Sequence, residues 1–333
     1  MRASIIEAGA FVFKPCLMVG LLLVLGFAIS CTGLGNRARS ENPGAPGTAK
    51  ATPIERAEAL NAKLAERLKT LCDSAGGDVG LAVVHVESGR TIDIEGAKAL
   101  PLYSVFKLPL AVAVLKDVEE KRVSLEQKVK VGPEDVAPGS RFNTDLWHKP
   151  VEKSVAELLE FSIVRSDNTS SDKLLQLIGG PAFVTKRMRA LGFSNINIQY
   201  TVREFVARRD EPNTGGAADL AHLLAKLQQG ELLPAAQTEL LLGLMTRAET
   251  GEHRLRSNLP SGTPVADKTG SGEAGATTND VGIITLPEAK GHLAMAVLIT
   301  GSKLTAEAQE KLIADLARAA YDSYVSGQAE ARP

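Results

Sequence analysis

Strand-like segments lie near both ends of this 333-residue chain, on either side of a long helical middle. Apolar runs of strand length that are bounded by turn residues are typical of β-strands. Such runs occupy residues 79–87, 91–95, 264–268, 280–286 and 292–299. Because strands must pair to satisfy their backbone groups, the two ends of the chain are expected to meet in one antiparallel sheet. The sequence therefore predicts an α/β (α+β) fold with flanking helices and an inserted all-α domain.

Helical patterns fill most of the remaining chain. Residues 54–72 form an amphipathic pattern that ends before two glycines, and a final helix is expected from Ala306 to about Tyr324. Between the strands, helices are expected at 105–121, 154–165, 169–178, 181–191, 217–229 and 235–247. With 44% hydrophobic residues, a chain of this length can bury one large core or two small ones.

Three short strings contain residues with catalytic chemistry. In chain order they are Ser104-Val-Phe-Lys107, Ser166-Asp167-Asn168 and Lys268-Thr269-Gly270. Together they supply a nucleophilic hydroxyl, a lysine that can act as its base, a second hydroxyl with an amide, and a second cation beside a glycine. These are the groups that an acyl-transfer serine hydrolase needs when it uses lysine rather than histidine.

The surroundings of Ser104 favour it as the nucleophile. It opens an apolar helix, residues 105–115, where the helix dipole and free N–H groups are available. Lys107 lies one turn on, and desolvation in so apolar a segment lowers the pKa of a lysine towards neutrality. The spacing alone is weak, since a helix lysine that reaches out to solvent produces it too. A second copy, Ser170 to Lys173, follows the middle string, and we expect Lys173 to be a solvated surface residue.

The strings and their surroundings resemble the class A β-lactamase family and its penicillin-binding relatives. The likeness extends over residues 54–325, through segments 100–115, 155–181, 250–260, 266–272 and 278–281. The resemblance implies a β-lactamase-like fold with the catalytic site in a cleft. Its parts are an α/β domain at residues 54–102 and 248–326, an all-α domain at 103–247 and a tail at 327–333.

The resemblance also implies a role for each residue of the first two strings. Ser104 attacks the lactam or amide carbonyl and becomes the acyl-enzyme, and Lys107 helps to deprotonate it. Ser166 relays a proton towards the leaving nitrogen, and Asn168 holds Lys107 and the amide of the substrate. The substrate implied is a small β-lactam or a peptide of peptidoglycan, and we expect no cofactor.

The third string corresponds to the substrate-carboxylate region of the family. Lys268 keeps the site positive, and Thr269 binds the substrate carboxylate. Gly270 completes the string, and the backbone N–H groups of Ser104 and Ser271 form the oxyanion hole. Each such donor contributes about 3–4 kcal/mol to transition-state stabilisation.

Arg254 matches a carboxylate-binding arginine that is found in part of the family. A surface arginine paired with Glu252 is the alternative interpretation, since the two lie close together in the sequence. The resemblance favours the binding role.

The chain departs from the family in the loop that holds the deacylating base. The family has a glutamate there in the pattern ExxLN, whereas the loop at residues 200–214 is several residues too short. Glu204 is the best candidate base, although Ala207 and Arg208 stand where Leu and Asn belong. Glu204 can equally be a solvated loop charge, which is the interpretation we favour for Glu211.

This departure leaves three functions open. Without a positioned glutamate, acylation through Lys107 can proceed while hydrolysis of the acyl-enzyme slows. We expect a β-lactamase; a penicillin-binding D-Ala-D-Ala peptidase with slow deacylation and a non-hydrolysing sensor of lactams or muropeptides are the alternatives.

The N-terminus resembles a bacterial targeting segment. Basic residues precede an uncharged apolar run at 16–29, and the following Ser-Cys31 resembles the end of a lipobox. Cleavage before Cys31 leaves a lipidated cysteine, whereas the uncharged stretch at residues 16–35 is long enough for an uncleaved membrane anchor. Either way we expect residues 1–31 to direct the protein to the periplasm or cell envelope, with 32–53 as a flexible tether.

Composition argues against several other classes of protein. The net charge is −1, from 38 basic and 39 acidic residues, and aromatics make up 4%, so no nucleic-acid surface is indicated. The five histidines show no metal-binding spacing, and we expect no metal site. Of the three cysteines, we expect Cys72 to be a buried core thiol outside any disulfide. We expect a monomer.

Overall fold

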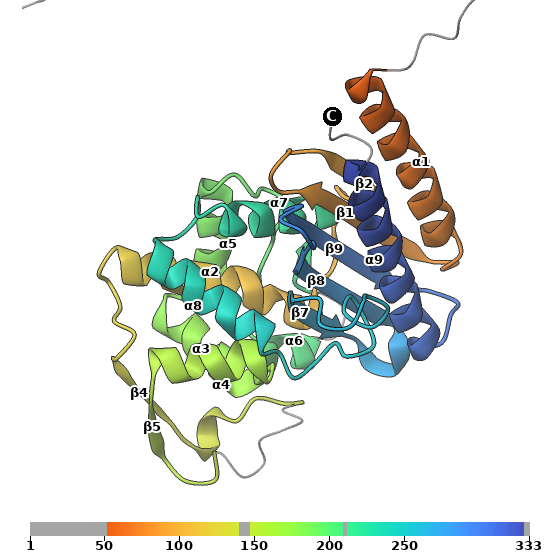
Figure 1. Cartoon of the computed structure of the whole chain (residues 1–333). Coiled ribbons are helices and arrows are strands. Elements are labelled where there is room, and N and C mark those ends of the chain that lie inside the picture. The colour runs from red at the N-terminus through yellow and green to blue at the C-terminus, as the bar shows by residue number, and fades with distance from the viewer. Residues whose placement is uncertain (1–51, 140–146, 209–211, 330–333) are drawn as a thin grey trace, which may run out of the picture. The chain divides into compact units, whose positions relative to one another are not determined.

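One antiparallel sheet joins strands from both ends of the chain. The computed structural model describes residues 52–139, 147–208 and 212–329. In these residues the largest sheet has the strand order β2-β1-β9-β8-β7 (Figure 1). Its members are β1 (Asp78–His85), β2 (Thr91–Ile94), β7 (Val265–Ser271), β8 (Thr277–Thr285) and β9 (His292–Thr300). β1 pairs with β9 along its whole length, which confirms the predicted sheet.

Two helices cover one face of this sheet. α1 (Pro53–Asp73) and α9 (Ala306–Ala329) pack against each other, although they lie at opposite ends of the described chain (Figure 1). Alternate residues of a strand point to opposite faces. Accordingly Leu81 and Val83 of β1 are buried beneath these helices, while Ala82 and Val84 belong to the core on the other face.

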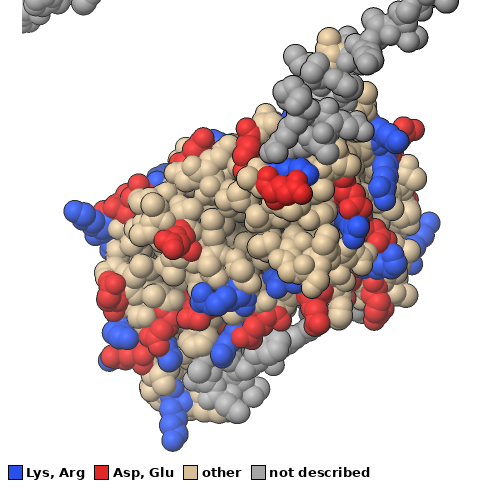
Figure 2. All heavy atoms as spheres, in the orientation of Figure 1, with Lys and Arg blue, Asp and Glu red and all other residues tan. Residues whose placement is uncertain are grey.

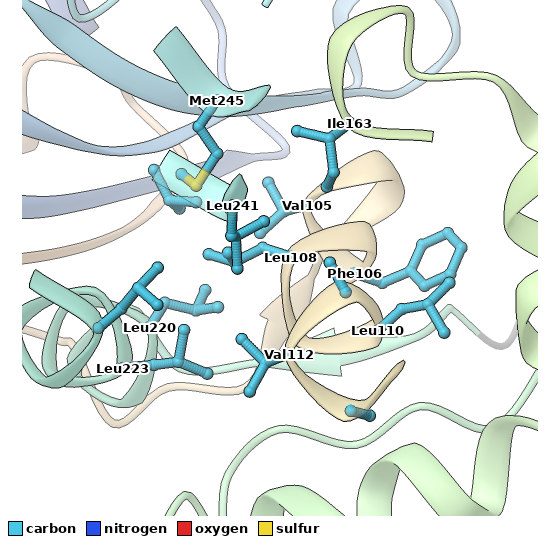
Figure 3. Packing of buried hydrophobic residues seen from close by; sticks show 14 of the residues in the cluster. Val105, Phe106, Leu108, Leu110, Val112, Ile163, Leu220, Leu223, Leu241 and Met245 are labelled. Carbon is cyan, nitrogen blue, oxygen red and sulfur yellow. The ribbon is translucent and has the colours of Figure 1, made fainter. Parts of the chain in front are cut away.

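The helical insert surrounds α2 (Lys107–Glu119). Every residue from Lys107 to Leu115 is buried, and a helix that is apolar all round must be enclosed by other elements. The enclosing helices are α3 (Val155–Val164), α4 (Asn168–Leu177), α5 (Pro181–Ala190), α7 (Ala217–Gln228) and α8 (Ala235–Thr246). Figure 3 shows Val105, Leu108 and Val112 packed with side chains of α3, α7 and α8. α7 also packs against β1 and β9, which joins the insert to the sheet.

Several short elements differ from the sequence prediction. The chain enters α2 through a 3₁₀ turn, η1, so that the predicted helix begins with a tighter turn around Ser104. Strands of two to four residues, and a helix of seven residues, are too short to show a clear hydrophobic period. The short elements that differ from the sequence prediction are three 3₁₀ helices, two strand pairs and one α-helix. They are η1 (Tyr103–Phe106), η2 (Pro133–Asp135), η3 (Glu273–Gly275), the pair β3 (Leu100–Pro101) and β6 (Thr214–Gly215), the pair β4 (Lys128–Val131) and β5 (Val151–Ser154), and α6 (Val202–Arg208).

The predicted targeting segment lies outside the described residues. This applies to the apolar run, to Cys31 and to all but the last two residues of the tether. Among the helices that the structure describes, none is both long and apolar enough to cross a membrane.

The surface has mixed charge. The face in Figure 2 has acidic and basic side chains interspersed around apolar and polar ones. Its balanced pattern agrees with the net charge of −1. A single-sign surface of the kind that binds nucleic acid is absent from the part of this face that the structure describes.

Candidate active site

Ser104 and Lys107 meet where η1 runs into α2. The backbone is left-handed at Tyr103, with φ of 46°, and η1 then brings Ser104 to the wall of a cavity of about 470 Å³. Lys107 Nζ lies 3.0 Å from Ser104 Oγ. Three residues make one turn of a 3₁₀ helix, so side chains with this spacing stand one above the other.

The middle motif brings Ser166 and Asn168 to the same lysine. Lys107 Nζ lies 2.6 Å from Ser166 O, 3.2 Å from Ser166 Oγ and 2.7 Å from Asn168 Oδ1. Ser166 joins α3 to α4 with φ of 56°, a left-handed conformation that residues other than glycine rarely adopt. Asn168 Nδ2 donates to Pro138 O at 2.8 Å, which fixes the orientation of its amide.

The contacts of Lys107 fit a neutral amine. Such an amine has two N–H groups and one lone pair. Its two shortest contacts are to Ser166 O and Asn168 Oδ1, which can only accept and therefore take the N–H groups. The lone pair is then available to the Ser104 hydroxyl. Burial, reinforced by the charge of Lys268, lowers the pKa of Lys107 well below its usual value, so that it can act as a base.

Lys268 approaches Ser166 from the other side. Its Nζ lies 3.0 Å from Ser166 Oγ and 2.9 Å from Thr269 O. Full burial lowers the pKa of Lys268 to about 8, so its side chain remains mostly protonated at neutral pH. Ser166 Oγ thus lies between a lysine that can be neutral and a lysine that stays charged.

Strand β7 runs very close to the turn that carries Ser104. A Cβ atom on Gly270 would lie 3.1 Å from Val105 N and 3.2 Å from Ser104 N, and closer still to Leu102 O. A side chain at this position would force β7 and η1 apart. The third motif therefore needs glycine here for steric reasons.

The backbone N–H of Ser271 is suitably placed for an oxyanion hole. β7 lies at the edge of the sheet, and Gly272 N donates inward to Thr277 O at 2.8 Å. Successive N–H groups of a strand point to opposite sides, so that of Ser271 points away from β8. Ser271 and Ser104 both line the cavity.

Arg254, Thr250 and Thr269 line the cavity near the end of β7. The hydroxyls of Thr250 and Thr269 lie 2.7 Å apart. Arg254 is 7% exposed, and its ionic partner is Glu310 at 3.1 Å. The alternative of a surface arginine paired with Glu252 is therefore wrong, because Arg254 is buried against α9.

Two buried carboxyl groups behind β7 escaped sequence reasoning. Asp267 forms an ion pair with Arg256, and Asp280 accepts a hydrogen bond from Leu255 N at 3.1 Å. Burial raises the pKa of Asp267 to about 6 and that of Asp280 well above its usual value, to which the charge of Asp267 adds. Burial and the charge of Asp267 thus both favour the protonated form of Asp280. The only signal in the sequence is an acidic residue next to Lys268 inside a strand.

The structure does not bring Glu204 to the other site residues. Its carboxylate accepts hydrogen bonds from Thr201 N at 2.9 Å and Thr201 Oγ1 at 3.0 Å, which makes a capping box at the start of α6. Glu204 is exposed, whereas its neighbours Phe205 and Val206 line the cavity. The ring of Tyr103 meets Phe205 edge-on at 5.5 Å. Apolar side chains thus form the wall in which the resemblance implies a carboxylate; Glu211 lies outside the described residues.

Asp172 of α4 holds the start of α6. Its Oδ1 accepts from Val202 N at 2.7 Å and its Oδ2 from Arg203 N at 3.1 Å. These are free N–H groups of the first helical turn, which need acceptors outside the helix. Asp172 is buried and belongs to the second copy of the Ser-x-x-Lys spacing.

The second Ser-x-x-Lys copy is structural, and one expectation about it is wrong. Ser170 is buried and its hydroxyl donates to Asp167 at 2.6 Å. Lys173 is not solvated: its side chain is 15% exposed and pairs with Asp135 at 3.1 Å. The apolar period of α4 could not reveal this partner, because Asp135 lies in η2, 38 residues earlier in the chain.

Other sequence expectations concern residues away from the cavity. Cys72 is buried, and burial raises the pKa of its thiol to about 12, in agreement with a core thiol. Over residues 52–139, 147–208 and 212–329, no group of three or more potential metal ligands comes together.

Comparisons with known proteins agree with the described fold. A family profile described as "Beta-lactamase enzyme family" matches residues 63–324. The extended-spectrum beta-lactamase PER-1 of Pseudomonas aeruginosa is 32% identical over 273 residues, which cover 78% of this chain and 86% of that protein. Beta-lactamase VEB-1 of the same organism is 28% identical over 277 residues, with 78% and 90% covered. The crystal structure of a beta-lactamase from Chitinophaga pinensis has a TM-score of 0.76 and 30% identity, and covers 78% of this chain and 99% of its own.

Proposed function

The chain belongs to the class A β-lactamase family, and on this premise we propose that it is a serine hydrolase that opens β-lactam rings through an acyl-enzyme on Ser104. The observation that carries the proposal is the convergence of groups on Lys107. Its Nζ lies 3.0 Å from Ser104 Oγ and 3.2 Å from Ser166 Oγ. One buried lysine thus connects a nucleophile with a proton relay. The relatives compared above are named as β-lactamases, which supports the same substrate class.

Acylation follows from these contacts. Ser104 Oγ forms a bond to the lactam carbonyl carbon, and its proton moves to the lone pair of Lys107 Nζ. The negative charge on the carbonyl oxygen is held by the backbone N–H groups of Ser104 and Ser271. The C–N bond then breaks, the ring nitrogen takes the proton of Ser166 Oγ, and Lys107 returns its proton to Ser166. Lys268 stabilises the negative charge that develops on Ser166 in this transfer.

Deacylation is the slow step in this proposal. A general base must lie within hydrogen-bond reach of the attacking water. Glu204 is engaged with Thr201, and Phe205 and Val206 line this side of the cavity. Their apolar surface does not hold a water by hydrogen bonds. The acyl-enzyme on Ser104 therefore accumulates before it is hydrolysed.

The apolar cavity wall formed by Phe205 and Val206 also supports a second candidate function. A protein that acylates and deacylates slowly behaves as a penicillin-binding peptidase or as a lactam sensor. The observation in its favour is the position of Phe205 and Val206 in the cavity wall, which receives no carboxylate from the loop residues that the structure describes. Turnover of a D-Ala-D-Ala peptide without turnover of β-lactams would favour the peptidase, and a stable adduct without any turnover would favour the sensor.

Covalent labelling tests the proposed nucleophile. A fluorescent penicillin should label the wild-type protein and leave Ser104→Ala unlabelled after denaturing electrophoresis. Ser170→Ala is the matched control, because Ser170 has the same Ser-x-x-Lys spacing yet donates its hydroxyl to Asp167. Labelling that persists in Ser104→Ala, or disappears in Ser170→Ala alone, would contradict the assignment.

Export and lipidation form a separate part of the proposal. Class A enzymes are typically periplasmic or secreted, and the segment ending in Ser-Cys31 supports attachment through a lipidated cysteine. Labelling cells with a radioactive fatty acid should mark the wild-type protein but not Cys31→Ser. Membrane retention of both proteins without label would instead support an uncleaved anchor.

A further inference from the structure

All five N–H donors of Arg254 are already engaged within the protein. Nε and one Nη2 proton point to Glu310 Oε1, both at 3.1 Å. The second Nη2 proton points to Ser271 Oγ at 2.7 Å. The two Nη1 protons point to the carbonyl oxygens of Gly270 at 3.2 Å and Asn279 at 2.8 Å. Because a guanidinium has five donors and no more, a substrate carboxylate can reach Arg254 only by displacing Glu310 or Ser271.

Glu310 brings a negative charge to the same end of the cavity. It projects from α9 and lines the cavity together with Arg254 and Ser271. Its side chain is 26% exposed, and that of Arg254 is 9% exposed, so solvent screens this pair only in part. An incoming anion therefore meets an arginine whose charge is largely cancelled, next to a carboxylate that repels it.

We propose that Glu310 is a specificity-determining residue that favours β-lactams with a cationic substituent next to their carboxylate. This inference rests on the proposed function and adds a substrate preference to it. In a cephalosporin the C3 substituent is bonded next to the carbon that bears the carboxylate. With the carboxylate at Thr269, a C3 cation that points towards the Arg254 end of the cavity is attracted by Glu310. A cephalosporin with an uncharged C3 group gains no such attraction.

Binding to an acylation-silent protein tests the inference apart from catalysis. Two cephalosporins with the same acyl side chain are compared, one with acetoxymethyl and one with pyridiniomethyl at C3. Their dissociation constants are measured by calorimetry with Ser104→Ala and with Ser104→Ala/Glu310→Gln. Glutamine keeps the size of the side chain and an oxygen acceptor for Arg254, so the fold is retained. Glu310→Gln should shift the affinity ratio about tenfold towards the acetoxymethyl compound, which corresponds to 1.4 kcal/mol.

Glu307→Gln is the matched control for this shift. Glu307 lies on the same helix, is exposed, and is not among the residues that line the cavity, so its neutralisation changes net charge without touching Arg254. The control should leave the affinity ratio within about twofold of the unsubstituted value, since exposed charges are screened.

Three results would overturn the inference: an unchanged ratio in Glu310→Gln, an equal shift in Glu307→Gln, or no binding of either compound. Absence of an acyl adduct in the wild-type protein is a different result. It would refute the proposed hydrolase while the affinity ratio still decides the role of Glu310.

Discussion

Replacement of Gly270 by alanine is expected to impair acylation more than it impairs stability. The new Cβ would lie 3.1 Å from Val105 N and 3.2 Å from Ser104 N, with Leu102 O nearer still. Ordinary C···O contacts begin at about 3.3 Å, so β7 and η1 must separate by on the order of 1 Å. Overpacking of this kind costs about 1–3 kcal/mol of unfolding free energy. Because Ser104 and the oxyanion donors sit on the two segments that separate, acylation should slow by about 10²-fold or more.

The control is Gly243→Ala in α8. Its Cβ would meet only Arg247 Nη1, at 3.9 Å, and alanine is favoured over glycine inside a helix by up to about 1 kcal/mol. Acylation is followed by intact mass after rapid mixing with a penicillin, and stability by urea unfolding. If Gly270→Ala acylates at the wild-type rate, the close approach of β7 to η1 does not set the geometry of the site, and the reasoning is refuted.

The same geometry predicts four other outcomes. Lys107→Arg should abolish acylation in a stopped-flow assay, because arginine stays protonated; fast acylation would contradict a neutral Lys107. Lys268, whose pKa is lowered to about 8, is charged below that pH and neutral above it, so KM should rise above pH 8 in the wild type and stay flat in Lys268→Arg. Asp172→Ala should lose about 1–3 kcal/mol in urea unfolding, and Asp172→Asn less; equal midpoints would argue against the clamp on α6. Glu204→Gln should leave steady-state turnover unchanged, and slower turnover would reinstate it as the base.

The fold could be predicted from the sequence because each helix and strand of the main elements has its own hydrophobic pattern within one continuous segment. The strands of the main sheet have apolar runs, and their position at the two ends of the chain requires the ends to meet. The three catalytic motifs could also be recognised in the sequence, because the reactive groups of each motif lie within a few neighbouring residues. Lys107 is an example, because the apolar residues that follow it in the sequence are buried together with it in α2.

The features that sequence reasoning missed depend on partners far apart in the chain. Glu310 looks like an ordinary surface residue of an amphipathic helix, and only the packing of α9 brings it to Arg254. Asp172 meets the N–H groups of Val202 and Arg203, 30 and 31 residues further on. The sequence left Glu204 open between a loop base and a solvated loop charge, and its hydrogen bonds to Thr201 at the start of α6 are visible only in three dimensions.

The central claim is that Ser104 forms an acyl-enzyme faster than the protein can hydrolyse it. Stopped-flow mixing with a chromogenic cephalosporin, with parallel acid quenching and intact mass, tests this most directly. We predict a burst of about one equivalent per protein, a covalent adduct that grows with the burst, and a slower steady state. Rapid steady turnover without a burst, with no adduct at any time, would contradict the account.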